Sequence, residues 1–494
     1  MEPSQNSQAP PMKISTLVSS IGFGMFMSSL DATIVVIILE KIKSHYGVTS
    51  NEVQWVILSY LLTMMAFTTI AGDLGDKFSN KLIFQIGMAL FALGSLFCFL
   101  SGYFGGSIWW LVLSRAIQGL GATGMLGNGM ALLTRFTTKK NRGTAVGINN
   151  LLISIAVITG PVFGALISDA WEWGGVFLIN VPLGIIGFIW IQFVIPKTPP
   201  VEKEHKADYV GSILFAIFLT TLILSFTIFV DIQLANAKMW AGISLLTSII
   251  IFPIFILWER KTEHPLVDLS MLKNKKISIG LFTAIIKHQG YIIIIYHINL
   301  YLQEMGIETD ILRVGLIISG LPVGMAIAAG ISGKLSNTVD ARYLCTIAMV
   351  GVTIMLALLS IFIDISTPTW FYVIVASVIG MCIGLFLSPN GNSIMSAAPK
   401  EKLGVASGLH GLTTSIGINL GIALSTLVFT LSGNLLSKEN GLPPESPVNY
   451  VQSMKWMFLI FAVITGIAAV VSFFRGPEDR TLGQPSLQDN QNTQ

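Results

Sequence analysis

Long apolar runs, each interrupted by a short polar segment, follow one another along almost the whole chain. A helix needs about 20 apolar residues to cross the hydrocarbon core of a bilayer. Lipid offers no hydrogen-bond partners to the backbone, so each such run must be helical. The pattern predicts fourteen membrane-spanning helices: 14–38, 53–73, 82–104, 109–134, 143–168, 174–195, 210–230, 239–257, 277–301, 314–335, 343–363, 370–395, 404–431 and 454–474.

The composition agrees with a membrane protein. Hydrophobic residues make up 53% of the chain and charged residues only 11%, whereas soluble domains carry about 25% charged residues. The net charge of +3 is too small to indicate a nucleic-acid partner. Each of the three cysteines lies inside an apolar run, so no disulfide framework or metal-ligand spacing is present in the sequence. The first twelve residues lack a basic segment, and we interpret the first apolar run as a retained span rather than a signal peptide.

Basic residues are concentrated in alternate loops. If the N-terminus is cytoplasmic, most lysines and arginines lie on the cytoplasmic side, and few lie in the outer loops. This distribution is the one that positive-inside sorting produces. It predicts an even number of spans with both termini cytoplasmic, in a plasma membrane (the inner membrane if the host is Gram-negative).

The chain also contains an internal repeat. The segment 72–76 recurs loosely at 333–337, and the segment 143–151 recurs at 404–412, with the same offset in both cases. A duplication therefore predicts an N-terminal six-helix bundle over 1–195 and a C-terminal bundle with a tail over 277–494. Residues 196–276 would form a linker with two inserted helices. Parallel halves of this kind place a solute site between them near the bilayer midplane, with alternating access by rocking.

Two charged residues are predicted inside the first half, at similar depth. Asp31 lies in the first span and Arg115 in the fourth. A carboxyl group within a bilayer is costly unless it is paired, hydrated or protonated, and such groups usually carry function. Asp31 would therefore bind protons or substrate, and Arg115 would pair with it directly or through water. A purely structural ion pair is the alternative.

Further polar positions are weaker candidates for substrate binding. Lys287 and His288 lie near the middle of the ninth span. Lys287 would bind an anionic substrate group, pair with Asp31, or line an aqueous vestibule if the span is misplaced. The other candidates are single polar or aromatic residues within spans, each of which is also compatible with simple packing: Trp55, Tyr60, Asn128, Asn149 and Asn390.

Three short motifs predict conformational roles. The segment from Gly72 to Lys81, which includes Asp76, joins the second and third spans and would latch neighbouring helices. Gly160, Pro161 and Gly164 in the fifth span would allow close helix contact and a kink. Gly119 follows Arg115 by four residues in the fourth span.

Together these segments resemble the fourteen-span drug:proton antiporter branch of the major facilitator superfamily over nearly the whole chain. Gly72 to Lys81 is similar to the superfamily motif between spans 2 and 3, with Ser79 and Asn80 as departures from it. Arg115, Gln118 and Gly119 match a span 4 motif implicated in proton transfer, and Gly160, Pro161 and Gly164 match a span 5 motif associated with antiport. Leu30 to Val35 resembles the span 1 motif, and Phe177 to Pro182 resembles a further stretch typical of the branch.

The resemblance implies an all-α polytopic membrane protein with two six-helix bundles, two inserted helices and fourteen transmembrane helices. It implies proton-coupled export of small amphipathic compounds, with Asp31 and Arg115 coupling proton movement to conformation. A dedicated exporter of an endogenous metabolite, such as a siderophore, is the near alternative, and a proton-coupled nutrient importer the further one. We expect no enzymatic activity, cofactor or metal. The expected partners are a small-molecule substrate, protons and lipid, without nucleic acid, and the expected state is a monomer.

Overall fold

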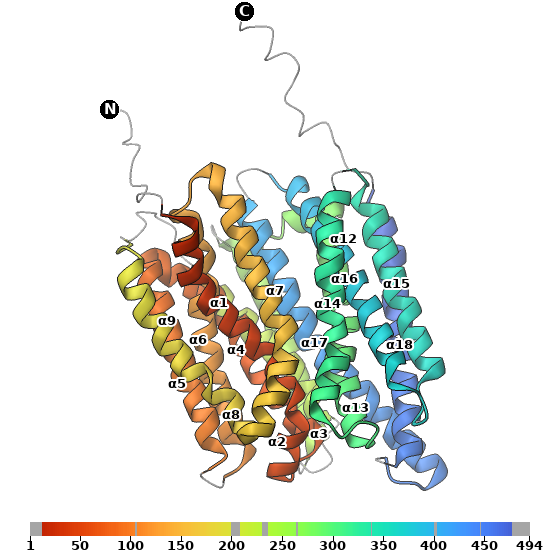
Figure 1. Ribbon diagram of the computed structural model, residues 1–494. Coiled ribbons are helices and arrows are strands. Elements are labelled where there is room, and N and C mark those ends of the chain that lie inside the picture. Colours follow the sequence, from red (N-terminus) through yellow and green to blue (C-terminus); the bar gives the residue numbers. More distant parts are fainter. Residues whose placement is uncertain are drawn as a thin grey trace, which may run out of the picture.

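The computed structural model describes residues 12–103, 106–198, 208–229, 236–262, 265–336, 338–399, 403–444 and 446–476. Every regular element in these ranges is a helix (Figure 1). Most helices run between two ends of the molecule. We call the end where α1 begins and α18 ends the terminal end, and the opposite end the distal end.

The first set of helices covers the N-terminal part of the chain. Two short helices connect α1 to α4 at the distal end, and α8 continues into α9 after a turn at Ile179. The bounds are α1 Ile14–Ile37, α2 Leu39–Tyr46, α3 Ser50–Val53, α4 Trp55–Lys77, α5 Asn80–Ser101, α6 Ile108–Arg135, α7 Lys139–Ala170, α8 Glu172–Leu178 and α9 Asn180–Val194.

The remaining helices comprise a pair in the middle of the chain and a second large set. The middle pair is α10 Tyr209–Phe229 and α11 Ala237–Lys261. The second set is η1 Met271–Lys273, α12 Lys275–Ile292, η2 Ile293–Ile298, α13 Asn299–Glu304, α14 Ile311–Leu335, α15 Ala341–Phe362, α16 Thr369–Ala397, α17 Leu403–Asn440 and α18 Pro447–Phe473. The element η2 is a short π-helix that joins α12 to α13.

The two large sets repeat the same helix pairings. In the first set α1 packs on α7, α4 on α6 and α5 on α9. In the second set α12 packs on α17, α14 on α16 and α15 on α18, which are the corresponding pairs. The two sets meet along α7 and α14, which lie side by side in Figure 1. They also meet along α4 and α17. Helix α10 contacts both α4 and α17, so the middle pair lies beside this second seam.

The share of each helix that is buried inside the protein differs between central and peripheral helices. In α1, 78% of the most apolar window is buried inside the protein, whereas in α11 only 17% is buried. A helix that is apolar all round but mostly unburied is matched to lipid rather than to water. The periphery of the molecule is accordingly rich in exposed leucine, isoleucine, phenylalanine and tryptophan side chains.

The predicted number of fourteen spans exceeds the number of strongly apolar helices. Within the described residues, 11 helices are long and apolar enough to cross a membrane, or 12 if the bent helix beginning at Ser50 and ending at Lys77 is one span. Helices α6 and α7 fall outside this set. Helix α6 contains Arg115, Gln118 and Asn128 together with several glycines, all of which lower its hydropathy.

Candidate functional site

A buried ion pair lies at the centre of the first set of helices. Asp31 on α1 and Arg115 on α6 have side chains that are 0% and 1% exposed. Arg115 Nη1 donates to Asp31 Oδ2 at 2.5 Å. Of the arrangements that the sequence left open, direct or bridged by water, the structure shows the direct pair.

The second oxygen of Asp31 is also bound. Asp31 Oδ1 accepts hydrogen bonds from Gln118 Nε2 at 2.8 Å and from Asn180 Nδ2 at 2.9 Å. Gln118 lies one helical turn after Arg115 and accepts from Arg115 Nη1 at 2.5 Å, so both reach the carboxylate from α6. Asn180 reaches it from the first turn of α9. The carboxylate thus has partners on two helices besides its own, and the pair as a whole is neutral.

Arg115 is fixed from further sides. Its Nε donates to the carbonyl oxygen of Val56 at 2.9 Å. The guanidinium carbon lies 4.3 Å from the centre of the Tyr60 ring and 5.7 Å from that of Phe177, distances at which cation–π attraction contributes. Tyr60, predicted as a substrate-lining residue, therefore lies against Arg115, and its hydroxyl donates to the Ser28 carbonyl at 3.4 Å. Loss of the Asp31 charge would remove the partner of Arg115, which belongs to α6 and is bonded to α4.

The glycine–proline motif of α7 packs directly against α1 just after Asp31. A Cβ atom on Gly160 would lie 2.1 Å from Thr33 Oγ1, and one on Gly164 would lie 2.8 Å from the Ile34 carbonyl oxygen. Both distances are shorter than van der Waals contact, so only glycine permits this approach. On its other side, α7 meets α14, where a Cβ on Gly315 would lie 2.9 Å from the Pro161 carbonyl oxygen. Helix α7 therefore connects α1 to the second set of helices.

The segment between α4 and α5 is held by amide side chains. Asn80 Nδ2 donates to Asp76 Oδ1 at 3.2 Å and to Asn128 Oδ1 at 3.1 Å. Asn128 Nδ2 in turn donates to the Ala71 carbonyl at 2.9 Å. Asn128 was predicted to line the substrate path, but its amide instead joins α4 to α6. Asn80, a departure from the family motif, donates two of these three bonds.

The other motif residues have separate packing roles. Lys81 Nζ donates to the carbonyl oxygens of Gln192 and Ile195 at 2.9 and 2.6 Å, and so binds the end of α9. Gly119 allows α6 to approach the Tyr60 carbonyl oxygen, which would lie 2.7 Å from a Cβ at this position. A Cβ on Gly72 would lie 3.7 Å from the Gly127 carbonyl oxygen, an ordinary contact distance, so packing does not require glycine there.

Lys287 and His288 lie apart from the Asp31 pair. His288 Nδ1 lies 2.8 Å from the Ala284 carbonyl oxygen and is therefore the protonated nitrogen, which leaves Nε2 as an acceptor for Lys287 Nζ at 3.3 Å. Lys287 is 4% exposed and lies 5.9 Å from the Phe386 ring. Among the described residues it has no carboxylate partner, and the predicted alternative of a Lys287–Asp31 pair is not what the structure shows.

The remaining predicted lining residues differ in how well their polar atoms are satisfied. Asn390 Oδ1 accepts from Arg475 Nη2 at 2.7 Å, so it is occupied by a buried arginine near the end of the described chain. Asn149 is fully buried, and within the described residues both polar atoms of its amide lack a hydrogen-bond partner. Trp55 is half-buried and lies 6.4 Å from the Trp109 ring. Asn149 is thus the predicted residue with the most unused hydrogen-bonding capacity.

Two residues that the structure places at these sites were not predicted from the sequence as site residues. Asn180 was counted only as part of a family stretch, although an amide within an apolar span is itself a signal. Arg475 was counted as a loop charge, but it is 2% exposed and bonds to Thr283 and Asn390. Its position directly after an apolar run gives no sign of this burial.

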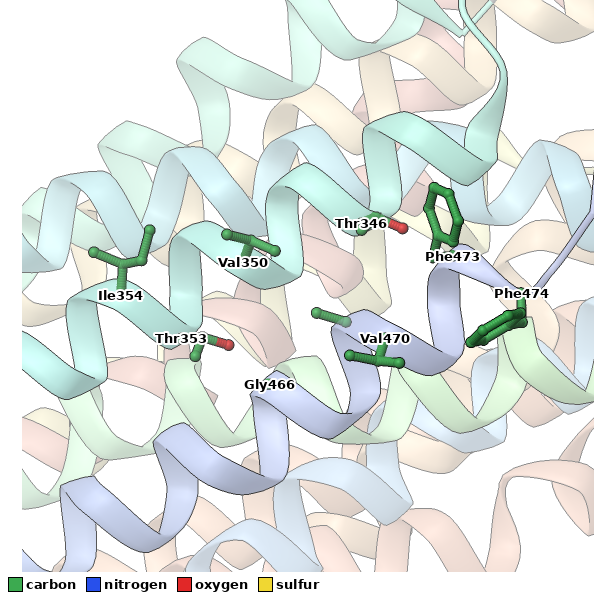
Figure 2. A pocket seen from close by; sticks show the side chains of 9 residues that line it. Thr346, Val350, Thr353, Ile354, Gly466, Val470, Phe473 and Phe474 are labelled. Atoms are coloured by element: carbon green, nitrogen blue, oxygen red, sulfur yellow. The ribbon is translucent and has the colours of Figure 1, made fainter.

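A shallow groove on the outside of the molecule is separate from these residues. It has a volume of about 350 Å³ and lies between α15 and α18 (Figure 2). Its lining is almost wholly apolar, as Val350, Ile354 and Phe473 illustrate. The hydroxyl of Thr346 donates to the Arg342 carbonyl of its own helix, so only its acceptor side faces a ligand. This groove is suited to lipid chains rather than to a solute with polar groups.

Comparison with known families identifies the architecture. The model of the Major Facilitator Superfamily matches residues 21–422, which include Asp31, Arg115 and the α7 motif. The chain belongs to the major facilitator superfamily. This membership confirms the predicted superfamily and the all-helical transporter fold, while the branch within the superfamily stays a prediction.

Several members of the superfamily are similar to this chain. Riboflavin transporter RibZ of Clostridioides difficile is 28% identical over 414 residues, covering 83% of this chain and 87% of the relative. Multidrug resistance protein Stp of Mycobacterium tuberculosis is 28% identical over 426 residues, covering 85% and 77%. Among solved structures, a bacterial homologue of the human lysosomal transporter Spinster has a TM-score of 0.67 at 15% identity, covering 94% and 96%. The chain is therefore a multi-pass membrane transporter of the major facilitator type.

Proposed function

We propose that this protein exports small amphipathic compounds in exchange for protons, by alternating access of two six-helix halves. The observation that carries the proposal is the fully buried Asp31–Arg115 pair, whose carboxylate is bound by residues from α6 and α9. An intramembrane acid of this kind is the usual place for proton binding in a transporter. Some relatives are named as multidrug resistance proteins, which supports this substrate class.

The geometry suggests how proton binding would act on conformation. Protonation of Asp31 would remove the charge that holds Arg115, and Arg115 also bonds to α4 through the Val56 carbonyl. Loss of one charge in a buried pair is strongly unfavourable for the other. The surrounding helices would therefore rearrange. Because α7 packs on α1 beside Asp31 and on α14 with its other side, the rearrangement would reach the second half.

The proposal includes the topology that the sequence predicts. Helices α6 and α7 would be two of fourteen spans, their polar residues tolerated because they face the protein interior. Both termini would be cytoplasmic, in a plasma membrane. The first half would end at 195 and the second would begin at 277, with α10 and α11 as the inserted pair.

A buried lysine in the second half indicates which class of substrate the protein would carry. Lys287 contributes a buried amino group with no acidic neighbour among the described residues, while the charge of Asp31 is already matched by Arg115. A buried Lys287 amino group, a neutralised Asp31 and the Asn149 amide, which has no partner among the described residues, favour neutral or anionic compounds over dications. Riboflavin, which one relative is named for transporting, is a suitable neutral probe.

Two alternative functions would give different results in transport assays. A dedicated exporter of one metabolite, such as a siderophore, would transport a metal-free chelator and ignore dyes. A proton-coupled nutrient importer would concentrate its substrate in right-side-out vesicles. The glycine–proline contact of α7 with α1, which matches a motif associated with antiport, favours export.

Transport by everted membrane vesicles with an acidic lumen tests the proposal. Ethidium, riboflavin and a metal-free hydroxamate would be supplied outside, and their accumulation in the lumen measured with and without a proton ionophore. Accumulation that the ionophore abolishes is the expected result. Uptake only by right-side-out vesicles would overturn export, and accumulation that survives the ionophore would overturn proton coupling.

A further inference from the structure

Three charged side chains lie together at the distal end, where the two halves meet. Glu40 and Lys43 are on α2, and Glu304 ends α13. Lys43 forms an ion pair with Glu304, and its Nζ lies 3.5 Å from Glu40 Oε2. The side chains of Glu40, Lys43 and Glu304 are 26%, 22% and 10% exposed. Two carboxylates thus share one ammonium group in a mostly buried position, leaving one negative charge unmatched.

Neutral groups extend this contact between the halves. Ser50 Oγ on α3 donates to Glu304 Oε1 at 2.9 Å, and Tyr296 donates to the Ser50 carbonyl at 3.3 Å. Asn299 Nδ2 donates to the Val36 carbonyl at the end of α1 at 2.6 Å. The distal end is therefore joined by hydrogen bonds and one ion pair in the conformation that the structure shows.

The local sequence holds the two short helices in place for this contact. Gly47, with a φ of +64°, ends α2 in the left-handed conformation that favours glycine. Thr49 and Glu52 form a capping box that begins α3 immediately afterwards. Ser50 is the first residue of α3, so these two signals fix its hydroxyl close to Lys43 and Glu304.

Of these three side chains, Glu40 is the one whose environment makes its protonation respond to pH. Burial, and then the charge of Glu304, raise the pKa of Glu40 above its ordinary value of 4.5, and Lys43 only partly opposes them. Burial lowers the pKa of Lys43, but its two carboxylate neighbours outweigh burial and raise it overall, so Lys43 keeps its charge. Tyr296 from η2 and Tyr450 from α18 also lie near these carboxylates. The nearby Lys41 pairs with Asp169 of its own half instead.

We propose that Glu40, Lys43 and Glu304 form a proton-sensitive latch, which holds the two halves together at the distal end and closes more firmly when that side becomes acidic. The latch rests on the movement of two halves in the proposed function, but not on Asp31 or on any substrate.

The direction of the pH effect follows from linkage. In the closed form Glu40 is buried beside Glu304 and binds a proton more tightly than an ordinary glutamate does. In an open form, water would surround Glu40 and its pKa would return towards the ordinary value. The closed form then binds more protons, so falling pH favours it, in the range between the ordinary and the raised pKa. At higher pH both carboxylates are charged, and their repulsion weakens the closure.

Distances between two spin labels across the distal end test the latch. The labels would be attached to cysteines replacing the exposed Tyr103 of the first half and Ser366 of the second, after the three native cysteines are changed to alanine. Measurements in lipid nanodiscs from pH 5 to pH 8, without substrate, compare the parent with Glu40→Gln, Glu304→Gln and Lys41→Gln. Lys41→Gln is the matched control, because its ion pair joins α2 to α7 within one half.

The expected results separate the three side chains. Glu304→Gln should lower the ratio of closed to open forms by about tenfold, a value between those of surface and buried ion pairs. The parent should close further as pH falls, Glu40→Gln should be equally closed at all pH values, and Lys41→Gln should match the parent. A Glu304→Gln population like that of the parent, a Glu40→Gln variant that keeps the parent's pH response, or one unchanging distance in all variants would overturn the latch. Failure of proton-driven export in vesicles would leave these results untouched.

Discussion

Removing Arg115 should leave a buried carboxylate without its cation, and the cost can be estimated from the structure. The Arg115→Met variant keeps much of the side-chain volume but removes the charge. Asp31 is fully buried, and breaking one side of a buried ion pair costs about 3–5 kcal/mol. Removing both charges with Asp31→Asn and Arg115→Met should cost clearly less than the two single changes together. The pair would then show a coupling energy of about 2 kcal/mol or more.

The free energy of unfolding in detergent micelles, from a titration with dodecyl sulfate followed by circular dichroism, would measure these effects. Asp169→Asn is the matched control, because its ion pair with Lys41 is 55% and 32% exposed on its two sides. An exposed pair of that kind contributes about 0–1 kcal/mol after solvent screening. If Arg115→Met cost no more than Asp169→Asn, or if the double variant cost the full sum of the single changes, the description of a dry, interacting pair would be refuted.

Three further variants, together with one control, test other helix contacts by the same titration. Gly164→Ala places a Cβ 2.8 Å from the Ile34 carbonyl and should destabilise by about 1–3 kcal/mol, whereas Gly330→Ala, which meets nothing within 4 Å, should be neutral or stabilising. Asn180→Leu removes a hydrogen bond to a charged group and should cost about 1.5–3 kcal/mol, and a change below 0.5 kcal/mol would contradict the bond seen in the structure. Asn128→Ala leaves buried partners on α4 and Asn80 unsatisfied and should cost about 1–3 kcal/mol, with an unchanged midpoint as the contrary result.

The general fold could be predicted because lipid imposes a simple rule on each span. The apolar runs are long and the intervening loops are short, so most helices could be located from the sequence. Hydropathy locates a span least well where the helix carries polar residues that face the protein interior. Helices α6 and α7 are less apolar than their neighbours because they carry Arg115, Gln118 and the glycines that the contacts with α1 and α4 require. The polar residues and glycines that lower the hydropathy of these two helices also form the site, so the helices are hard to recognise as spans for the same reason that they are functional candidates.

Depth along the membrane led to the prediction of an Asp31–Arg115 pair, direct or through water. Asp31 near the C-terminal end of α1 and Arg115 near the N-terminal end of α6 lie a similar number of residues from the distal end. Depth could not reveal Asn180, because its approach to Asp31 depends on the turn at Ile179 and on how α9 crosses α1. It also could not separate Asn128, whose amide is used in packing, from Asn149, whose amide has no partner in the described residues. That difference depends on contacts between helices, which no single-span pattern contains.

Proton release by purified protein in liposomes tests the central claim most directly. Liposomes with an acidic lumen and a trapped pH indicator would receive, from outside, whichever of ethidium, riboflavin or the hydroxamate the vesicle assay identifies. We predict that substrate triggers proton loss from the lumen with the unaltered protein and with Asp169→Asn, and that Asp31→Asn abolishes it while the protein remains folded. Proton loss that persists in Asp31→Asn would contradict the assignment of proton coupling to this carboxylate.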